Sequence, residues 1–355
     1  MKILALTRYC HLGASSRVRF FQYIPMLHRF DINVHVKPLL RDEYLARLYA
    51  KQPTDWVELL HGYLRQAVGL LRVGKFDLLW IEKEIFPNLP AWFEQALRVL
   101  GVRYVVDYDD AIFHNYDLSS NPLKRLLSNK IDKVMRGAVL VVCGNAYLAE
   151  KARQAGARRV EIVPTVIDLE RYQVQDQKLG ERVVVGWVGS PITAKYLEIV
   201  APALREVAAE FPAQLRVIGA QVDLPGLDVD CRPWTEKAEV SEIKNFDIGI
   251  MPLVDSPWER GKCGYKLIQY MGCGVPGIAS PVGVNRDIIE HDVNGYLATD
   301  TDGWLSAFRL LCTDAQLRRT IGMRGRRRVE QRFCLQITAP QLARLFYEAT
   351  GSGIA

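Results

Sequence analysis

Short apolar runs recur along the first half of the chain, with helical stretches between them. Strands that alternate with helices in this way form a parallel sheet with helices on both faces. We therefore predict a doubly wound α/β domain in this half. Its expected strands are Ile3–Thr7, Ile32–Lys37, Leu78–Ile81, Tyr104–Asp107, Val139–Cys143 and Val160–Val163.

The alternation pauses at the polar stretch Gln173–Gly180 and then resumes. The expected strands of the second half are Val183–Val188, Leu215–Ile218, Val229–Cys231, Ile248–Met251, Gly277–Ala279 and Gly295–Ala298. We predict domains at residues 1–173 and 181–334, and a helix over Ile337–Ala349 in a last segment, 335–355, that returns to the first domain. Because ligands bind outside the carboxyl ends of parallel strands, two such domains facing across a cleft would form their site between them.

Composition narrows the class of protein. With 355 residues, 49% hydrophobic and 24% charged, the chain is long enough for two globular domains. Seven cysteines without a C-x-x-C pair, and no secretory leader, predict a cytoplasmic protein. The net charge of +6 suits phosphate-bearing ligands or an anionic membrane surface, and does not require nucleic acid. The basic run Arg324–Arg328 is either a solvated helix face or a membrane or partner contact.

The loop after the first strand combines small residues with an arginine. Gly13, Ser15, Ser16 and Arg17 could bring backbone N–H groups and a guanidinium to an anion at a helix start. Neither a dinucleotide fingerprint nor a P-loop motif is present. The alternative is a serine-capped turn that opens a helix over Arg17–Leu27.

Carboxylates gather just after the strand that ends at Asp107. Asp107, Asp109 and Asp110 would repel one another unless they bind something, so this segment predicts a polar site that also includes His114. We expect contact with sugar hydroxyls or an acceptor rather than with a metal ion.

Two glycine-containing loops in the second half carry lysines. Lys262, Gly264 and Lys266 surround the start of a short helix, where backbone amides and ammonium groups could hold a diphosphate without a divalent cation. Gly189, Ser190 and Lys195 repeat the arrangement after the strand Val183–Val188. The alternative is that these lysines are ordinary surface residues. Trp234 follows another strand, where it could stack on a base or belong to the core.

At these residues the chain resembles the retaining, GT-B-fold glycosyltransferases of family 4. The stretch Gly264–Ser280 is similar to that family's signature, and Asn294–Leu297 is similar to its Asn-Gly-Leu-Leu turn. The resemblance implies a nucleotide-diphosphate sugar donor, such as a UDP- or GDP-sugar, no further cofactor, and transfer with retention to a glycan or lipid-linked saccharide. It also implies polysaccharide synthesis at the cell envelope and peripheral contact with a membrane.

The chain departs from the family pattern at positions that contact the donor in the family. Gly261 and Gln269 stand where the family has two glutamates, so Gln269 would contact the donor ribose and Glu259 could supply the missing sugar contact. Asp109 stands where many members have a histidine, and we predict Asp109 and Lys266 as catalytic residues. Tyr265 joins the predicted donor site.

Two other functions fit the same residues. The loss of both glutamates allows a non-catalytic scaffold subunit that binds nucleotide sugars. A nucleotide-sugar epimerase shares the expected fold, but it needs carboxylates beside the sugar that this chain lacks. Donor turnover by the purified protein separates the transferase from the scaffold.

Overall fold

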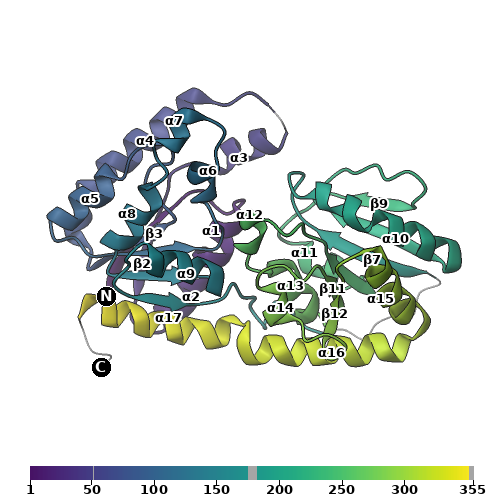
Figure 1. The fold of residues 1–355 in the computed structure, drawn as a ribbon. Helices are drawn as coiled ribbons and strands as arrows, with labels where there is room; N and C mark the ends of the chain where they lie inside the picture. The colour runs from purple at the N-terminus through teal and green to yellow at the C-terminus, as the bar shows by residue number, and fades with distance from the viewer. Residues whose placement is uncertain (51, 175–181, 352–355) are drawn as a thin grey trace. The chain divides into compact units, whose positions relative to one another are not determined.

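The computed structural model describes residues 1–50, 52–174 and 182–351. It contains two six-stranded parallel sheets with helices on their faces, which confirms the predicted α/β fold class (Figure 1). The chain forms two compact units. The first comprises Met1–Thr165, Arg260–Cys263 and Gln336–Ala355, and the second comprises Val166–Glu259 and Gly264–Leu335.

The domain bounds 1–173, 181–334 and 335–355 stay a prediction. Residues 175–181, where the sequence places the boundary, lie outside the described residues. The assignment of two short segments to the compact units differs from what the sequence suggests. Residues 166–174 group with the second unit, and Arg260–Cys263 group with the first.

The first sheet has the strand order β2-β1-β3-β4-β5-β6. Every residue of β3, β4 and β5 is buried, whereas the edge strands β2 and β6 are partly exposed. Central strands covered on both faces are mostly apolar, which explains why apolar runs predicted them, and the carboxylates Glu82 and Asp107 come only near the carboxyl ends of β3 and β4. The strands are β1 (Lys2–Thr7), β2 (Asn33–Pro38), β3 (Leu78–Glu82), β4 (Tyr104–Tyr108), β5 (Leu140–Cys143) and β6 (Val160–Ile162).

The helices of the first unit are mostly short. They are α1 (Ala14–Arg19), η1 (Phe21–Tyr23), α2 (Ile24–His28), α3 (Asp42–Tyr49), α4 (Trp56–Leu70), η2 (Val73–Lys75), α5 (Trp92–Val99), α6 (His114–Asp117), α7 (Pro122–Arg125), α8 (Lys130–Gly137), α9 (Ala146–Gln154) and α17 (Leu335–Thr350). The single helix expected over Arg17–Leu27 is wrong, because the chain forms α1, η1 and α2 there. Pro25 lies in the first turn of α2, where its missing N–H is tolerated, and it could not continue an earlier helix.

The second sheet has the order β12-β11-β10-β7-β8-β9, and its neighbouring strands are parallel. Counted within the unit, this is the Rossmann strand order. The strands are β7 (Val183–Val188), β8 (Ala213–Ile218), β9 (Val229–Arg232), β10 (Ile248–Met251), β11 (Gly277–Ala279) and β12 (Gly295–Leu297). All twelve strands predicted from the sequence are therefore present in the two sheets.

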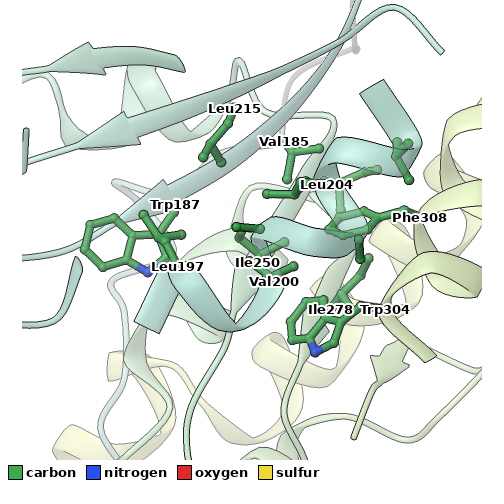
Figure 2. Close-up of a cluster of buried hydrophobic side chains, with 14 of the residues drawn as sticks. Val185, Trp187, Leu197, Val200, Leu204, Leu215, Ile250, Ile278, Trp304 and Phe308 are labelled. Atoms are coloured by element: carbon green, nitrogen blue, oxygen red, sulfur yellow. The ribbon is translucent and has the colours of Figure 1, made fainter. Parts of the chain in front are cut away.

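One face of the second sheet packs on α10 and α15. Figure 2 shows this cluster, in which side chains of β7 and β10 meet Leu197, Val200 and Leu204 of α10. Trp304 and Phe308 of α15 close it, with ring centroids 6.0 Å apart. The helices of this unit are η3 (Ala194–Tyr196), α10 (Leu197–Glu210), α11 (Glu239–Ile243), α12 (Pro257–Arg260), α13 (Tyr265–Gly272), α14 (Asn285–Ile288), α15 (Thr301–Thr313) and α16 (Ala315–Arg332).

Each sheet has a point at which the strand order reverses. It lies between β1 and β3 in the first sheet and between β7 and β10 in the second. In open parallel sheets the loops that leave such neighbouring strands diverge to opposite faces, and the crevice between them binds ligands. The fold therefore directs attention to the loops after β1 and β3, and to those after β7 and β10.

The basic run Arg324–Arg328 lies on α16, and its interpretation as a solvated face is wrong for Arg326. This side chain is buried and donates to the backbone oxygens of Tyr172 and Gly272. Its guanidinium holds together segments of the second unit rather than a partner. Among the described residues, no helix is both long enough and apolar enough to cross a membrane.

Helix α16 packs closely on the loop that follows α13. A side chain at Gly322 would collide with the carbonyl group of Gly274, which itself has a φ of 75°. We therefore expect Gly322→Ala to lower the free energy of unfolding by about 1–3 kcal/mol. Urea unfolding measures this loss. Gly74→Ala, with nothing within 4 Å of the added carbon, serves as control, and equal midpoints for the two variants would contradict the packing described.

Candidate functional site

In the first unit, Glu82 ties the loop after β1 to the end of β3. Its Oε2 accepts hydrogen bonds from the Ser16 hydroxyl at 2.7 Å and from the Arg8 backbone N–H at 2.8 Å. Ser16 is fully buried, and burial raises the pKa of Glu82. Ser16, predicted as a ligand residue, thus fixes the loop in place.

The other loop residues divide by exposure. Gly13 is the N-cap of helix α1, and no side chain accepts a hydrogen bond from the first backbone amides of that helix. The alternative of a serine-capped turn is therefore wrong. Arg17 is buried and donates to the His11 carbonyl oxygen at 3.0 Å. Ser15 remains partly exposed at the helix start.

Lys83 organises the carboxylates predicted as a polar site. Its ammonium lies 2.8 Å from Asp109 Oδ1 and 3.7 Å from Asp110 Oδ2, and it donates to the Ser15 hydroxyl at 3.1 Å. Lys83 also has a φ of 66°, a left-handed conformation uncommon for a residue with a side chain. Such strain clusters at functional sites. Sequence reasoning missed this role of Lys83, because no spacing links it to residues 109 and 110.

The two carboxylates differ in electrostatics. Burial is the largest influence and would raise the pKa of Asp109, but the Lys83 ammonium, with the Ser15 hydroxyl and Arg19, outweighs it and holds that pKa below its ordinary value. For Asp110, burial dominates and raises the pKa, although Lys83 and Lys262 oppose it. The Asp110 side chain is 31% exposed and that of Asp109 is 10% exposed, so Asp110 is the more accessible of the pair.

Asp107 is structural. Its carboxylate receives Arg19 Nε at 2.8 Å and Arg19 Nη2 at 3.1 Å, and Arg19 also donates to the Val163 carbonyl oxygen. Both side chains are 2% exposed. His114 is engaged as well, because one ring nitrogen lies 2.8 Å from Asp117 Oδ1 and the other lies 2.9 Å from the Tyr147 hydroxyl.

The segment Gly261–Cys263 belongs to this carboxylate site. Asn145, the N-cap of α9, donates through Nδ2 to the carbonyl oxygens of Gly261 at 2.9 Å and Lys262 at 3.0 Å. The Cys263 thiol donates to the Asp109 carbonyl oxygen at 3.1 Å. Lys262 is therefore placed with Asp110, in a different unit from Lys266.

In the second unit, the loop after β7 and the start of α13 come together. A Cβ at Gly189 would lie 3.0 Å from Lys266 Cε and 2.5 Å from the Trp187 ring. The Lys266 ammonium lies over that ring, 5.3 Å from its centroid. Gly264, the N-cap of α13, has a φ of 66° that suits glycine, and it turns the backbone into the helix. The first backbone amides of α13 and one ammonium thus lie at the edge of the sheet at the switch point.

The remaining residues of the loop after β7 lie nearer the surface. Lys195 is exposed, with its ammonium 5.2 Å from the Tyr196 ring centroid. Ser190 is half-buried, and its carbonyl oxygen accepts from the Thr193 hydroxyl at 3.1 Å.

A buried polar network surrounds Gln269. Gln269 Nε2 donates to the Tyr172 hydroxyl at 2.7 Å, and that hydroxyl donates to Glu239 Oε2 at 3.1 Å. Trp234 Nε1 donates to the other Glu239 oxygen at 2.8 Å. Glu239 is 3% exposed and Gln269 is 1% exposed, so the network is internal and holds Trp234 in place. The Tyr265 hydroxyl lies 3.5 Å from that of Tyr172.

Glu259 does not present a free carboxylate for the sugar contact suggested above. It is 5% exposed and accepts hydrogen bonds from the hydroxyl groups of Tyr196 and Ser256. Ser256 lies three residues before Glu259, whereas Tyr196 is 63 residues away and could not be found from spacing. Within the ranges that the structure describes, no group of three or more His, Cys, Asp and Glu residues could hold a metal ion.

Comparison with known proteins finds a family model that is similar to part of the second unit. Residues 182–314 match the family model described as "Glycosyl transferases group 1". That region contains the loop after β7, Trp234, Lys266 and Gln269. Apart from Arg260–Cys263, the match lies within the second unit, and it is a similarity of residues 182–314 to that family.

Two curated proteins are similar over part of the chain. N-acetyl-alpha-D-glucosaminyl L-malate synthase of Bacillus anthracis is 33% identical over 25% of this chain and 24% of its own length. The capsular polysaccharide biosynthesis glycosyltransferase CapM of Staphylococcus aureus is 26% identical over 51% of this chain and 52% of its own length. The chain thus spans about half of these relatives or less.

Solved structures are similar over nearly the whole chain. Sucrose-phosphate synthase of Thermosynechococcus elongatus has a TM-score of 0.75 at 14% identity and covers 99% of both chains. HepE of Anabaena, in a structure with UDP-glucose, has a TM-score of 0.70 at 17% identity and covers 98% of this chain and 100% of that one. At such low identity these likenesses show the fold, which is GT-B.

Replacing Lys83 by methionine should leave Asp109 buried without its cation. We expect Lys83→Met to lower the free energy of unfolding by about 3–5 kcal/mol at pH 7. In the native protein, the lowered pKa of Asp109 contributes stability that is present above the ordinary carboxyl pKa of about 3.9 and is lost as the pH falls through the lowered value. In the variant, burial is no longer opposed by Lys83 and raises that pKa, so the deficit should shrink as the pH falls from 7 to 5. Urea unfolding at both pH values measures it, with Lys133→Met on an exposed side chain as control, and a deficit independent of pH would contradict the assignment.

Gln269→Glu, which introduces the acid that the family pattern has, should disrupt the network around Tyr172. A carboxylate cannot donate to the Tyr172 hydroxyl, and this position is closed to water. We expect a loss of about 3 kcal/mol in unfolding free energy at neutral pH, which diminishes toward acid as the carboxyl takes up a proton. Gln316→Glu on the exposed start of α16 is the matched control. If both variants unfold at the same urea concentration, Gln269 is not held as described.

Proposed function

We propose that this chain is a glycosyltransferase that moves a sugar from a nucleotide-diphosphate donor to an acceptor hydroxyl. The observation that carries the proposal is the convergence of the Gly189 loop, Lys266 and the start of α13 at the switch point of the second sheet. The match of this region to group 1 glycosyl transferases supports it, as does the presence of UDP-glucose in the HepE structure.

The donor diphosphate would lie against the amides at the start of α13, beside Lys266. Backbone N–H groups and an ammonium hold phosphate without a divalent cation, so we infer that transfer is independent of metal. Lys195 and Ser190 would contact the diphosphate from the loop after β7. Trp234, held by Glu239, would stack on the base, which we infer to be that of a UDP- or GDP-sugar. Gln269 and Tyr265 would support this side of the site.

The acceptor would bind at the carboxyl edge of the first sheet. Asp110 is accessible and could accept a hydrogen bond from the acceptor hydroxyl, whereas Asp109 stays anionic beside Lys83. A fixed negative charge favours a positively charged, oxocarbenium-like sugar. Gly13, Ser15 and the neighbouring loop would border the acceptor, with Ser16 and Arg17 fixing that loop.

We infer transfer with retention, as the family resemblance implies. The bond between the anomeric carbon and the diphosphate oxygen breaks, and a bond from that carbon to the acceptor oxygen forms on the same face. The acceptor proton passes to the departing diphosphate oxygen, whose charge Lys266 and the α13 amides stabilise. The similarity to CapM supports a glycan or lipid-linked acceptor in envelope polysaccharide synthesis.

The activity is tested by a screen of UDP-, GDP-, ADP- and TDP-sugars with EDTA present, by thermal shift and by release of the nucleoside diphosphate. One donor should raise the melting temperature and be turned over. Binding without any turnover, with acceptors supplied, would favour the non-catalytic scaffold. If the protein binds none of these four nucleotide sugars, the proposed donor site is overturned.

Lys266→Ala should weaken donor binding. Hydrogen bonds to charged groups contribute about 1.5–3 kcal/mol, so we expect the donor Kd to rise roughly tenfold to a hundredfold. Isothermal titration calorimetry measures it. Lys237→Ala removes an exposed lysine of the same unit and should leave the Kd unchanged. Equal Kd values for the two variants would remove Lys266 from the site.

A further inference from the structure

Arg8 follows β1 directly, at the point where the strand order of the first sheet reverses. Its backbone is held from both sides, because its N–H donates to Glu82 Oε2 at 2.8 Å and its carbonyl oxygen accepts from the Leu40 N–H at 3.0 Å. A side chain fixed in this way at the carboxyl edge of a parallel sheet lies where such folds bind ligands.

The guanidinium of Arg8 is charged but unpaired. Among the residues that the structure describes, no protein group forms a hydrogen bond or an ion pair with it. Its Nε is enclosed, whereas the residue as a whole is half-buried, so the outer nitrogens reach solvent. Burial is the largest influence and would lower its pKa, but Tyr9, Glu84 and Glu82 outweigh it and raise that pKa. An enclosed charged N–H without a partner is costly, which makes Arg8 a candidate for a ligand contact.

The two acids nearest in sequence to this edge are engaged with other groups. Glu84 receives the Lys130 ammonium at 2.5 Å. Glu82 Oε2 accepts from the Ser16 hydroxyl and from the backbone of Arg8, not from its side chain. Burial also raises the pKa of Glu82, which weakens its negative charge. The positive charge of Arg8 is therefore left to act on a ligand.

Tyrosine side chains gather around this guanidinium. The Tyr9 ring centroid lies 5.9 Å from Arg8 Cζ. Burial raises the pKa of the Tyr44 hydroxyl on α3, Tyr9 raises it further, and the charge of Arg8 lowers it. Burial likewise raises the pKa of Tyr63 on α4 to about 12, and Arg8 opposes it. Such influences fade over about 10 Å, so these side chains are neighbours.

The hydroxyl groups of Tyr9 and Tyr44 are accessible to a ligand. Both tyrosines are half-buried, and across the described part of the chain neither hydroxyl is enclosed or has a hydrogen-bond partner. Tyr63 differs, since its hydroxyl donates to the Pro87 carbonyl oxygen at 2.6 Å. One guanidinium with open outer nitrogens and two unpaired hydroxyl groups form a set of N–H and O–H groups that suits an oxyanion.

We propose that Arg8, Tyr9 and Tyr44 bind an anionic group, a phosphate or a carboxylate, that the acceptor sugar carries. The guanidinium would bind two oxygens side by side, and the hydroxyl groups would donate to the same group. In the sheet, β1 and β4 are separated by β3 alone, so the strands that lead to Arg8 and Asp110 lie about 10 Å apart. One sugar residue with its anionic substituent can span this distance and present a hydroxyl to Asp110. That the ligand is the acceptor rests on the proposed function, whereas binding of an anion here does not.

The test is calorimetric titration with glucose 6-phosphate, glucuronate and glucose, without any nucleotide sugar. The chain carries Lys266→Ala, so that the proposed diphosphate site contributes little. We expect at least one anionic sugar to bind more tightly than glucose, and the tighter of the two identifies phosphate or carboxylate as the group. On this background, Arg8→Gln should raise its Kd roughly tenfold to a hundredfold, and Tyr9→Phe with Tyr44→Phe about threefold to tenfold.

Arg29→Gln is the matched control, because it removes an exposed arginine of the same unit, and it should leave the Kd unchanged. The proposal is overturned if neither anionic sugar binds more tightly than glucose, or if Arg8→Gln binds as tightly as Arg29→Gln. Should Arg8→Gln fail to fold, the double tyrosine variant decides, since it keeps the charge and both rings, and an unchanged Kd overturns the proposal. A failed screen of nucleotide sugars leaves these outcomes unaffected, so the two proposals fail separately.

Discussion

The parallel arrangement of strands is the constraint on which the rest of this structure depends. A strand covered on both faces by helices has no room for polar side chains, so charge and hydrogen-bonding groups are confined to the edge where the carboxyl ends meet. In both sheets the loops at the reversal of strand order carry the chemistry, with Lys83 and its carboxylates in the first unit and Lys266 with Gly189 in the second.

Confining charges to one buried edge requires that they compensate one another. The first unit does this with matched pairs, Arg19 with Asp107 and Lys83 with Asp109, so that the accessible Asp110 is the carboxylate left to face solvent. The second unit surrounds the buried acids Glu239 and Glu259 mainly with neutral hydroxyl and indole donors, and Arg171 adds a guanidinium 3.7 Å from Glu239. The two edges suit different ligands, because an accessible acid favours hydroxyl groups and a helix N-terminus beside an ammonium favours phosphate.

The sequence predicts the sheets well and the networks poorly, for a physical reason. A buried parallel strand consists of a few consecutive, mostly apolar residues, so all twelve strands could be placed to within about two residues. The partners of buried polar groups are far apart in the chain: Arg19 and Asp107 are separated by 88 residues, and Tyr172 and Gln269 by 97. Glycines and lysines in short motifs indicated the phosphate loops, but no pattern showed that Glu259 and Gln269 would be enclosed by hydroxyl groups. The broken helix at Ile24 was missed because the pattern of apolar residues continues across Pro25.

The account rests on the binding of a diphosphate at the start of α13. The most direct test is a crystal structure of the chain with the nucleoside diphosphate of the donor that it binds. We expect a phosphate oxygen within about 3 Å of Lys266 Nζ and of the first backbone amides of α13. A diphosphate bound with Lys266 Nζ more than roughly 6 Å from any phosphate oxygen, beyond the range of a direct charge interaction, would contradict it.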